Sequence, residues 1–542
     1  MINFIHVFGL TLFTLVFKYI FLKDLYFYLD DFSVFSDFEE TNSIVPIFTD
    51  RPLAGIFLIS IFQVFKWNAI YYHIFGAIVE IIANLTVYHV CDGLIWNNKF
   101  YSSLTVLFFL LMPGHSQEYW WVILLTLKLL LVVWLGSIYF FYQFLLTKKN
   151  KFLWISSLLY GTTLFCYELA LFLPIIHGLL YARFVIWKEP KINFLKLLKT
   201  FSYFGAYIFA FLLFRFTKSF GLSSQFDRSQ VAIENIFIRT KDILQSTFWS
   251  YPQMDNYVGS QAFKGSRFTE FSFIITSLFL IFLILTWFYP IFKSSNTSNL
   301  FRKNDYIFTI ILSICLCLYP LIPFFLTSAW FDTRHTYLPH LGLAVIIVLI
   351  LRGFLEIIQK LKHKKIEYVI ILITFCFLVQ PLTSGAESMI GIGTIWRQVG
   401  LDLKNYEVIV KSNFPTVPPQ TLFLIKDAEI LRNWVPVFAG DWVVNGFFRK
   451  IYPMQGVKGD YYNISAEKNQ DNLKFKINPD FNSLMVAQKK YNFEQVIILD
   501  GKNQLRPFSA INIKTSKGNY LKKLQTSDNS DNLSSVLELY IP

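Results

Sequence analysis

Residues 119–146 read YWWVILLTLKLLLVVWLGSIYFFYQFLL and contain a single charged side chain, Lys128. A helix needs about 20 consecutive apolar residues to cross the hydrocarbon core of a bilayer. This stretch exceeds that length, so it predicts a membrane-spanning helix. Similar runs recur from Ile2 to Gln380, and we expect about eleven spans. Their approximate ranges are 4–22, 69–90, 100–113, 119–146, 152–167, 169–186, 200–216, 271–292, 305–326, 336–352 and 366–382.

The composition of the whole chain agrees with this prediction. Of its 542 residues, 54% are hydrophobic, 19% are aromatic and only 16% are charged. Typical soluble proteins have about 25% charged residues. A water-soluble globule cannot bury this much apolar surface, and a disordered chain would carry far less of it. The sequence therefore excludes an ordinary soluble enzyme and a disordered protein.

The net charge of +13 is distributed unevenly between successive loops. With the N-terminus taken as cytoplasmic, alternate loops between the spans are rich in Lys and Arg. The basic loops contain Lys148, Lys149, Lys151, Arg183, Lys188, Lys191, Lys196, Lys199, Lys293, Arg302, Lys303, Arg352, Lys360, Lys362, Lys364 and Lys365. This asymmetry follows the positive-inside rule. It accounts for much of the positive charge, so we expect no nucleic-acid partner.

The spans define a transmembrane domain over residues 1–382. We interpret residues 52–66 as an amphipathic helix on the membrane surface, and a short extra span remains an alternative there. A long outer loop is expected over residues 217–270. No small-residue cleavage site follows the first span, so we expect that span to be retained as an anchor.

Residues 383–542 are expected to form an extracytoplasmic α/β domain. The runs TLFLI (421–425) and QVIIL (495–499) are typical of strands, and Pro, Gly and Asn punctuate the sequence around them. The fold class predicted for the whole chain is therefore a polytopic α-helical membrane protein with a C-terminal α/β domain.

Two adjacent carboxylates, Asp30 and Asp31, follow the first span in the stretch YFYLDDF (26–32). Neighbouring carboxylates repel each other, which favours proton uptake by one of them. Such a group can accept a proton from a hydroxyl or ligate a divalent cation. The structural alternative is an aspartate that caps a helix at the membrane boundary. We treat both residues as catalytic candidates with a possible divalent metal, and the capping role remains open.

Further polar residues occur in other loops on the same predicted face of the membrane. They are Arg51, His115, Glu118, Glu168, Arg334, His335 and Tyr337. Each alone is compatible with a solvated loop residue. Because they come from loops far apart in sequence and share one leaflet, we expect them to assemble a binding site at the mouth of the bundle. An arginine there would match the oxygens of a lipid-linked phosphate in a fork.

Two charges, Glu80 and Lys128, are predicted to lie inside spans. Burying an isolated charge at membrane depth costs roughly several kcal/mol. Such residues therefore usually pair with another charge or line a polar cavity. Lys128 lies too deep in its run to reach the interface easily. We therefore expect the two residues to be paired or to face a polar cavity.

The order of these residues resembles the membrane-embedded glycosyltransferases of the GT-C superfamily. The most similar branch contains the protein O-mannosyltransferases and the transmembrane O-mannosyltransferases with TPR tails. The loop MPGHSQE (112–118) resembles that branch's H-P-x-H-x-E motif, and ELALFLP (168–174) resembles its K-E-x-A-L…P stretch, with Tyr167 in place of Lys. The stretch RHTYLPHLGL (334–343) resembles R-x-Y-L-P-S-x-G-L. The resemblance covers roughly residues 1–352 and does not include a TPR tail.

The resemblance implies a polyprenyl-phosphate sugar donor and a protein, lipid or glycan acceptor on the outer side of the membrane. It implies Asp30 or Asp31 as the catalytic base and Arg334 as the partner of the lipid phosphate. The substrate-binding residues would be Arg51, His115, Glu118, Glu168, Arg334, His335 and Tyr337. A direct displacement with inversion at the anomeric carbon is the simplest mechanism.

Two other classes of protein remain open: a transporter or channel, and a non-catalytic scaffold or lipid-glycan binding protein. A transporter is expected to contain duplicated half-chains with broken spans in matching places, and the sequence has no clear duplication. A non-catalytic protein would tolerate alanine at Asp30 and Asp31. We expect a multi-pass protein in membrane lipid, in the inner (plasma) membrane of a bacterium.

Overall fold

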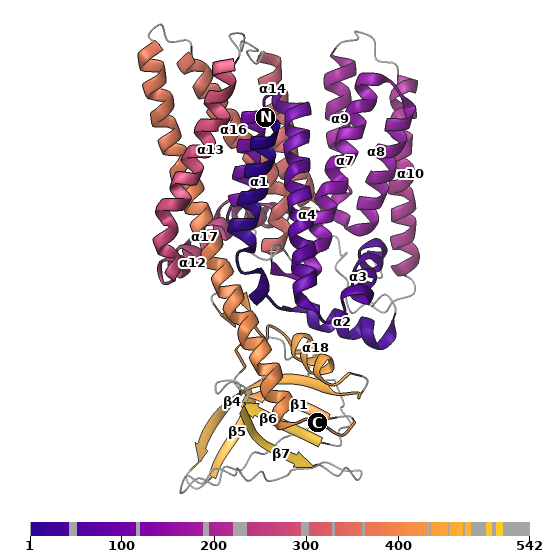
Figure 1. The fold of residues 1–542 in the computed structure, drawn as a ribbon. Coiled ribbons are helices and arrows are strands. Elements are labelled where there is room, and N and C mark those ends of the chain that lie inside the picture. The colour runs from indigo at the N-terminus through magenta and orange to yellow at the C-terminus, as the bar shows by residue number, and fades with distance from the viewer. Residues whose placement is uncertain are drawn as a thin grey trace. The chain divides into compact units, whose positions relative to one another are not determined.

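The structure is a computed structural model in which the chain forms two compact units (Figure 1). The first unit comprises Met1–Leu22, Pro46–Leu58 and Tyr71–Thr394, and the second comprises Lys23–Val45, Ile59–Ile70 and Ile395–Pro542. The residues described are 2–42, 51–114, 120–187, 194–219, 236–293, 303–327, 331–359, 364–419, 421–426, 428–429, 431–432, 435–453, 455–469, 472–478, 495–500 and 506–512.

The first unit is helical. Its α-helices, some of which extend into the second unit, are α1 (Ile2–Tyr19), α3 (Pro52–Phe65), α4 (Ala69–Val90), α5 (Lys99–Leu111), α7 (Leu125–Thr147), α8 (Asn150–Cys166), α9 (Pro174–Tyr181), α10 (Phe194–Ser219), α11 (Ile236–Gln245), α12 (Tyr251–Lys264), α13 (Ser272–Lys293), α14 (Lys303–Leu318), α15 (Ile322–Leu326), α16 (Tyr337–Gln359) and α17 (Lys364–Asn413). Short 3₁₀ segments are η4 (Val122–Leu124), η5 (Glu168–Ala170), η8 (Arg267–Phe271), η9 (Tyr319–Leu321) and η10 (Thr333–Thr336). Three π-helical turns are η3 (Cys91–Trp96), η6 (Ala182–Ile186) and η7 (Ser246–Ser250).

Within the described ranges, nine helical segments are long and apolar enough to cross a membrane. They are Phe4–Asp24, Ala69–Trp96, Val122–Thr147, Glu168–Ile186, Phe194–Phe216, Arg267–Thr286, Asn304–Leu326, Thr333–Ile358 and Val369–Asn413. These segments correspond to nine of the expected spans and support a multi-pass integral membrane protein.

The other two expected spans, 100–113 and 152–167, are occupied by shorter helices. Helix α5 has 13 residues and α8 has 17. At a rise of about 1.5 Å per residue, α5 is only about 20 Å long, less than the bilayer core of about 30 Å. The expected range 100–113 agrees with α5 to within two residues, and the side chain of Asn98 caps the start of this helix by accepting from Phe100 N and Tyr101 N.

The helices of the first unit pack in neighbouring groups. Helix α8 lies between α7 and α10 (Figure 1) and contacts both. Helix α16 packs against α14 and α5, and α1 packs against α5 and α13. The residues at these contacts are mostly large and apolar, including the fully buried Phe109, Leu131 and Val348.

The region 217–270, expected to be a long outer loop, contains helices α11 and α12 joined through η7. Their sequences are rich in amides, hydroxyls and aromatic residues, so no apolar run of span length marks them. The helical character was therefore missed, although residues 243, 247, 255, 259 and 263 are buried at helical spacing.

The second unit contains η1 (Leu22–Asp24) in part, α2 (Asp30–Thr41), the end of α3, the end of α17, α18 (Asp441–Ile451) and a sheet. The strands are β1 (Thr421–Lys426), β4 (Lys458–Asn469), β5 (Asn472–Asn478), β6 (Gln495–Asp500) and β7 (Arg506–Asn512), in the order β5-β4-β1-β6-β7. A separate hairpin pairs β2 (Leu431–Arg432) with β3 (Val435–Pro436). Strand β1 is parallel to β4 and β6, and both outer pairs are antiparallel.

The two expected strands at 421–425 and 495–499 coincide with β1 and β6. The central strand β1 is fully buried at alternate positions, Phe423 and Ile425, as expected for a strand with one face in a core. The ring of Phe423 stacks on Phe448 of α18 with centroids 4.2 Å apart. The expected domain boundary at 382–383 lies within α17, whereas the division between the units falls after Thr394.

Candidate functional site

A bidentate ion pair joins Arg51, directly before α3, to Glu168, the first residue of η5. Arg51 Nε and Nη2 donate to the two carboxylate oxygens of Glu168 at 2.9 and 2.6 Å. The guanidinium carbon also lies 3.9 Å from the centroid of the Tyr167 ring. Both contacts orient Arg51 within a partly solvated setting, since 16% of its side chain is exposed.

Tyr167 and Glu168 occupy a break between two helices. Helix α8 ends at Cys166, and Tyr167 has an extended backbone with φ −161° and ψ 132°. The chain then forms η5 before Pro174 begins α9. Proline is favourable at the first turn of a helix because it has no backbone N–H to leave unpaired. The break therefore places an aromatic ring and a carboxylate together at a helix end.

A second polar group is formed by η10. Asp332 caps this turn: its Oδ1 accepts from Arg334 N at 3.1 Å, and its own backbone N–H donates to His335 Nδ1 at 3.1 Å. Its Oδ2 lies 3.0 Å from Arg334 Nε. Burial alone would raise the pKa of Asp332, but the nearby charges of Arg334 and His335 hold that pKa below its ordinary value.

The two groups are connected through His335. Its Nε2 lies 3.3 Å from Tyr167 Oη. Because Nδ1 accepts from the backbone N–H of Asp332, a neutral His335 carries its proton on Nε2 and donates it to the tyrosine oxygen. A continuous polar path therefore runs from Glu168 through Arg51, Tyr167 and His335 to the Asp332–Arg334 pair. We call these six residues the arginine cluster.

The arginine cluster combines two guanidinium groups with two carboxylates. Arg334 lies over the ring of Trp121, with its guanidinium carbon 5.5 Å from the centroid. Its side chain is 20% exposed. The formal charges of Arg51, Arg334, Glu168 and Asp332 cancel. The carboxylates and rings fix the direction of each guanidinium, which is the pre-organisation that recognition of an anionic oxygen requires.

Tyr337 lies at the start of α16 and is fully buried. Its ring is 5.1 Å from that of Phe109 in α5. This position makes it part of the packing between α16 and α5, and its expected role in substrate binding stays a prediction.

His115 and Glu118 lie outside the described residues. The residue at which their loop begins, Gly114, has φ +98° and contacts two other segments. Its N–H donates to Asp255 Oδ2 at 3.0 Å, and its carbonyl accepts from Thr336 Oγ1 at 2.8 Å. The loop therefore starts beside η10. Asp255 was missed from the sequence because nothing in its surroundings marked it as a partner of this loop.

Asp30 and Asp31 belong to the second unit, at the start of α2, and they have different surroundings. Asp31 is fully buried, and its Oδ2 accepts from Tyr28 N at 2.9 Å. Asp30 is partly exposed, and its Oδ1 accepts from the indole N–H of Trp442 at 2.6 Å. The residue before them, Leu29, has φ +48°. A non-glycine residue in this region costs about 1–3 kcal/mol and persists where the surrounding structure enforces it.

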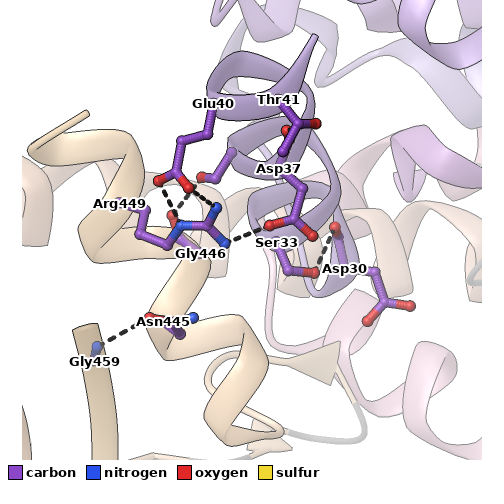
Figure 2. A network of polar contacts seen from close by, with 10 residues as sticks. Asp30, Ser33, Asp37, Glu40, Thr41, Asn445, Gly446, Arg449 and Gly459 are labelled. Carbon is purple, nitrogen blue, oxygen red and sulfur yellow. Dashed lines mark hydrogen bonds and ion pairs between the residues drawn. The ribbon is translucent and has the colours of Figure 1, made fainter. Parts of the chain in front are cut away.

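The rest of α2 is attached to α18. Figure 2 shows the guanidinium of Arg449 between the carboxylates of Glu40 and Asp37, with Arg449 Nε donating to Glu40 Oε1 at 2.8 Å. Burial alone would lower the pKa of Arg449, but both carboxylates hold it above its ordinary value. Ser36 Oγ also donates to Gly446 O at 2.9 Å. These contacts fix the helix that carries Asp30.

The hypothesis of a divalent metal at Asp30 and Asp31 has limited structural support. Across the described ranges, no group of three or more His, Cys, Asp or Glu side chains is arranged to hold a metal ion. The two carboxylates are held by different donors and do not offer a shared pair of ligands.

Glu80 and Lys128 are paired, as expected. Lys128 Nζ lies 3.5 Å from Glu80 Oε2, and a second cation, Lys18 Nζ, lies 2.8 Å from Glu80 Oε1. Lys128 also donates to Tyr19 Oη at 2.8 Å. All three charged side chains are essentially buried. Lys18 was missed because it lies near the end of the first span, where a lysine usually reaches the interface.

No protein-family model matches this chain, and no curated protein is similar to it at a significant level. Among solved structures, the chain is similar to ArnT from Cupriavidus metallidurans bound to undecaprenyl phosphate. The match has 11% sequence identity and a TM-score of 0.37, and it covers 90% of this chain and 92% of the ArnT chain. A likeness at this level carries no argument about function.

Proposed function

We propose that the chain is a membrane glycosyltransferase of the GT-C type that transfers a sugar from a polyprenyl-phosphate donor to an acceptor outside the cytoplasm. The observation that carries the proposal is the arginine cluster. Its residues come from three separate segments, around Arg51, Glu168 and Arg334, and the last two of these are among the stretches on which the resemblance rests. Their contact within one unit supports a common functional role for residues that are distant in sequence.

Arg334 and Arg51 are the proposed partners of the donor phosphate. A guanidinium presents five N–H donors in a planar fork that matches phosphate oxygens. Asp332 contacts the Nε of Arg334 and holds its plane against Trp121. The leaving group is a phosphate, which is already a weak base, so the reaction needs charge stabilisation there more than a proton.

Asp30 is the proposed base. It is partly exposed, whereas Asp31 is buried and bonded to the backbone of Tyr28. In the reaction, the acceptor hydroxyl attacks the anomeric carbon as its proton passes to Asp30. The bond between that carbon and the phosphate oxygen breaks, and the phosphate leaves with the electron pair. A single displacement inverts the anomeric centre.

The test incubates purified protein with radiolabelled polyprenyl-phosphate sugars and measures sugar release or transfer. We expect Asp30→Asn and Arg334→Gln to lower turnover by at least about a hundredfold, with expression and melting temperature near those of wild type. The exposed Glu270 provides a matched control, since Glu270→Gln should leave turnover unchanged. Full turnover in Asp30→Asn would remove the assigned base, and donor binding without turnover in wild type would favour the non-catalytic lipid-glycan binder.

A further inference from the structure

The exposed face of α11, η7 and α12 carries a groove that the arginine cluster does not use. The groove has a volume of about 820 Å³ and lies on the first unit. Its exposed lining residues recur at nearly every turn of the continuous helical stretch: Gln245, Trp249, Gln253, Tyr257, Gln261 and Lys264. This regular spacing places aromatic rings and side-chain amides alternately along one face.

The opposite face of the same helices is anchored. Asp255, Gly259 and Phe263 are buried at intervals of four residues. Ser388 Oγ of α17 donates to the backbone carbonyl of Asp255 at 3.1 Å. A methyl group at Gly259 would lie 2.3 Å from Ser388 O, so α12 and α17 approach at backbone distance. The groove therefore lies on a helix that is packed against α17, and not on a loop.

The two aromatic side chains in the groove project from this support. Trp249 is 66% exposed and Tyr257 is 67% exposed. Eight residues separate them, which corresponds to about 12 Å along a helix axis. An aromatic ring offers a flat apolar surface together with a polar edge. Two aromatic rings at this separation match a ligand of several linked rings better than one small molecule.

The groups between the platforms are amides. Within the described part of the chain, the side-chain amides of Gln245, Gln253 and Gln261 have no hydrogen-bond partner in the protein. Each amide provides two donors and one acceptor oxygen. Apart from Lys264 at one end, the exposed lining residues are uncharged. The face therefore complements an uncharged ligand rich in hydroxyl groups.

We propose that this groove binds a neutral carbohydrate chain. The apolar C–H faces of the sugar rings pack on Trp249 and Tyr257, and the hydroxyl groups exchange hydrogen bonds with the three glutamines. The π-helical turn η7 carries Trp249, and such turns occur frequently at functional sites. The site is separate from the proposed transfer chemistry and provides a place to hold a glycan.

The rival occupant is the membrane surface, since Trp and Tyr also gather at lipid interfaces. A helix in that environment presents apolar residues with flanking cations. Apart from Trp249 and Tyr257, the exposed large hydrophobic side chains of α11, η7 and α12 lie outside the groove, at the start of α11, where Phe237 is 88% exposed and Ile238 is 64% exposed. Three glutamines on the groove face favour the carbohydrate over lipid.

The test measures binding of neutral linear oligosaccharides of glucose, mannose and N-acetylglucosamine, and of the single sugars, to the full chain in phosphatidylcholine nanodiscs. We expect saturable binding that strengthens with chain length for at least one series. Trp249→Ala and Tyr257→Ala should each weaken it about three- to tenfold. Trp154→Ala is the matched control, because Trp154 is 57% exposed on α8, away from the groove face, and should leave binding unchanged. Asp30→Asn should bind normally, which separates this site from the proposed reaction.

Two further readouts keep the result interpretable. The melting temperatures of Trp249→Ala, Tyr257→Ala and Trp154→Ala should match wild type, because these three side chains are exposed. A fluorophore can be attached at Gln253→Cys in a chain whose native cysteines are replaced by alanine. Bound oligosaccharide should shield this fluorophore from the solvent, and brominated lipid should not quench its fluorescence. Absence of saturable binding in wild type, equal weakening by Trp154→Ala, or quenching by lipid would each overturn the proposal.

Discussion

Replacing Glu80 by glutamine should destabilise the first unit more than replacing either lysine that contacts it. Lys18 and Lys128 both point at this single carboxylate, at 2.8 and 3.5 Å, and none of the three side chains has appreciable exposure. The cluster thus holds two formal positive charges against one negative charge. Glu80→Gln removes the carboxylate charge that both lysines contact and leaves two buried ammonium groups beside a neutral amide.

The expected magnitude follows from this imbalance. Breaking a buried ion pair by removing one partner costs about 3–5 kcal/mol, because an uncompensated charge remains. Glu80→Gln should fall in or above that range. Lys128→Met removes the more distant cation and leaves the neutral Lys18–Glu80 pair, so it should cost less. Lys18→Met should be intermediate, since Lys128 remains but at the longer distance.

The assay is thermal unfolding of the purified protein in one detergent, followed by intrinsic tryptophan fluorescence. The ranking of apparent melting temperatures is the measured quantity, because unfolding of a large membrane protein is commonly irreversible. Glu270→Gln again serves as the control for an exposed glutamate. A Glu80→Gln protein that melts with the wild type, or a Lys128→Met protein that melts below Glu80→Gln, would refute the reasoning.

Four other outcomes are expected. Gly391→Ala should cost about 1–3 kcal/mol of stability, because the added methyl would lie 1.9 Å from a backbone oxygen in α12. Gly178→Ala, where no atom lies within 4 Å of the added methyl, should be neutral or slightly stabilising in the same melting assay. Arg449→Lys should lower stability by about 1 kcal/mol, with a smaller effect at high salt. Asp332→Asn should reduce the melting temperature near pH 7. Because the pKa of Asp332 is lowered in the folded state, its stabilising effect is present above about pH 4. This effect is lost as the pH falls below that value, so wild type and variant should converge in acid.

The spans could be predicted because a bilayer imposes one length on every crossing helix. Where the prediction differed, at α5 and α8, the helix ends are set by local chemistry. Asn98 begins α5 with its side chain, and Pro113 follows the end of that helix. An apolar run gives the approximate position of a helix, but on its own it does not distinguish a short helix from a complete crossing.

Four of the six members of the arginine cluster, Arg51, Glu168, Arg334 and His335, were predicted as candidates, but Tyr167, Asp332 and the connections between them were not. At position 167, this chain has a tyrosine where the motif of the similar family has a lysine. In the structure, its ring lies under Arg51 and its hydroxyl contacts His335. A tyrosine can serve both contacts at once because it has an apolar face and a polar end. Such a double role depends on three-dimensional placement, which one sequence does not contain.

The aspartate pair shows most clearly how helical geometry limits an inference from two adjacent residues in a sequence. Consecutive residues on an α-helix point about 100° apart, so a doublet at a helix start does not present two carboxylates to one ligand. Asp31 turns inward and accepts from Tyr28 N, while Asp30 meets the indole of Trp442. The N-cap of α2 is Leu29, without a side-chain capping bond, so neither aspartate caps the helix as the structural alternative supposed. Asp31 is instead a buried structural residue that accepts from Tyr28 N, and Asp30 has the partial exposure that a base requires.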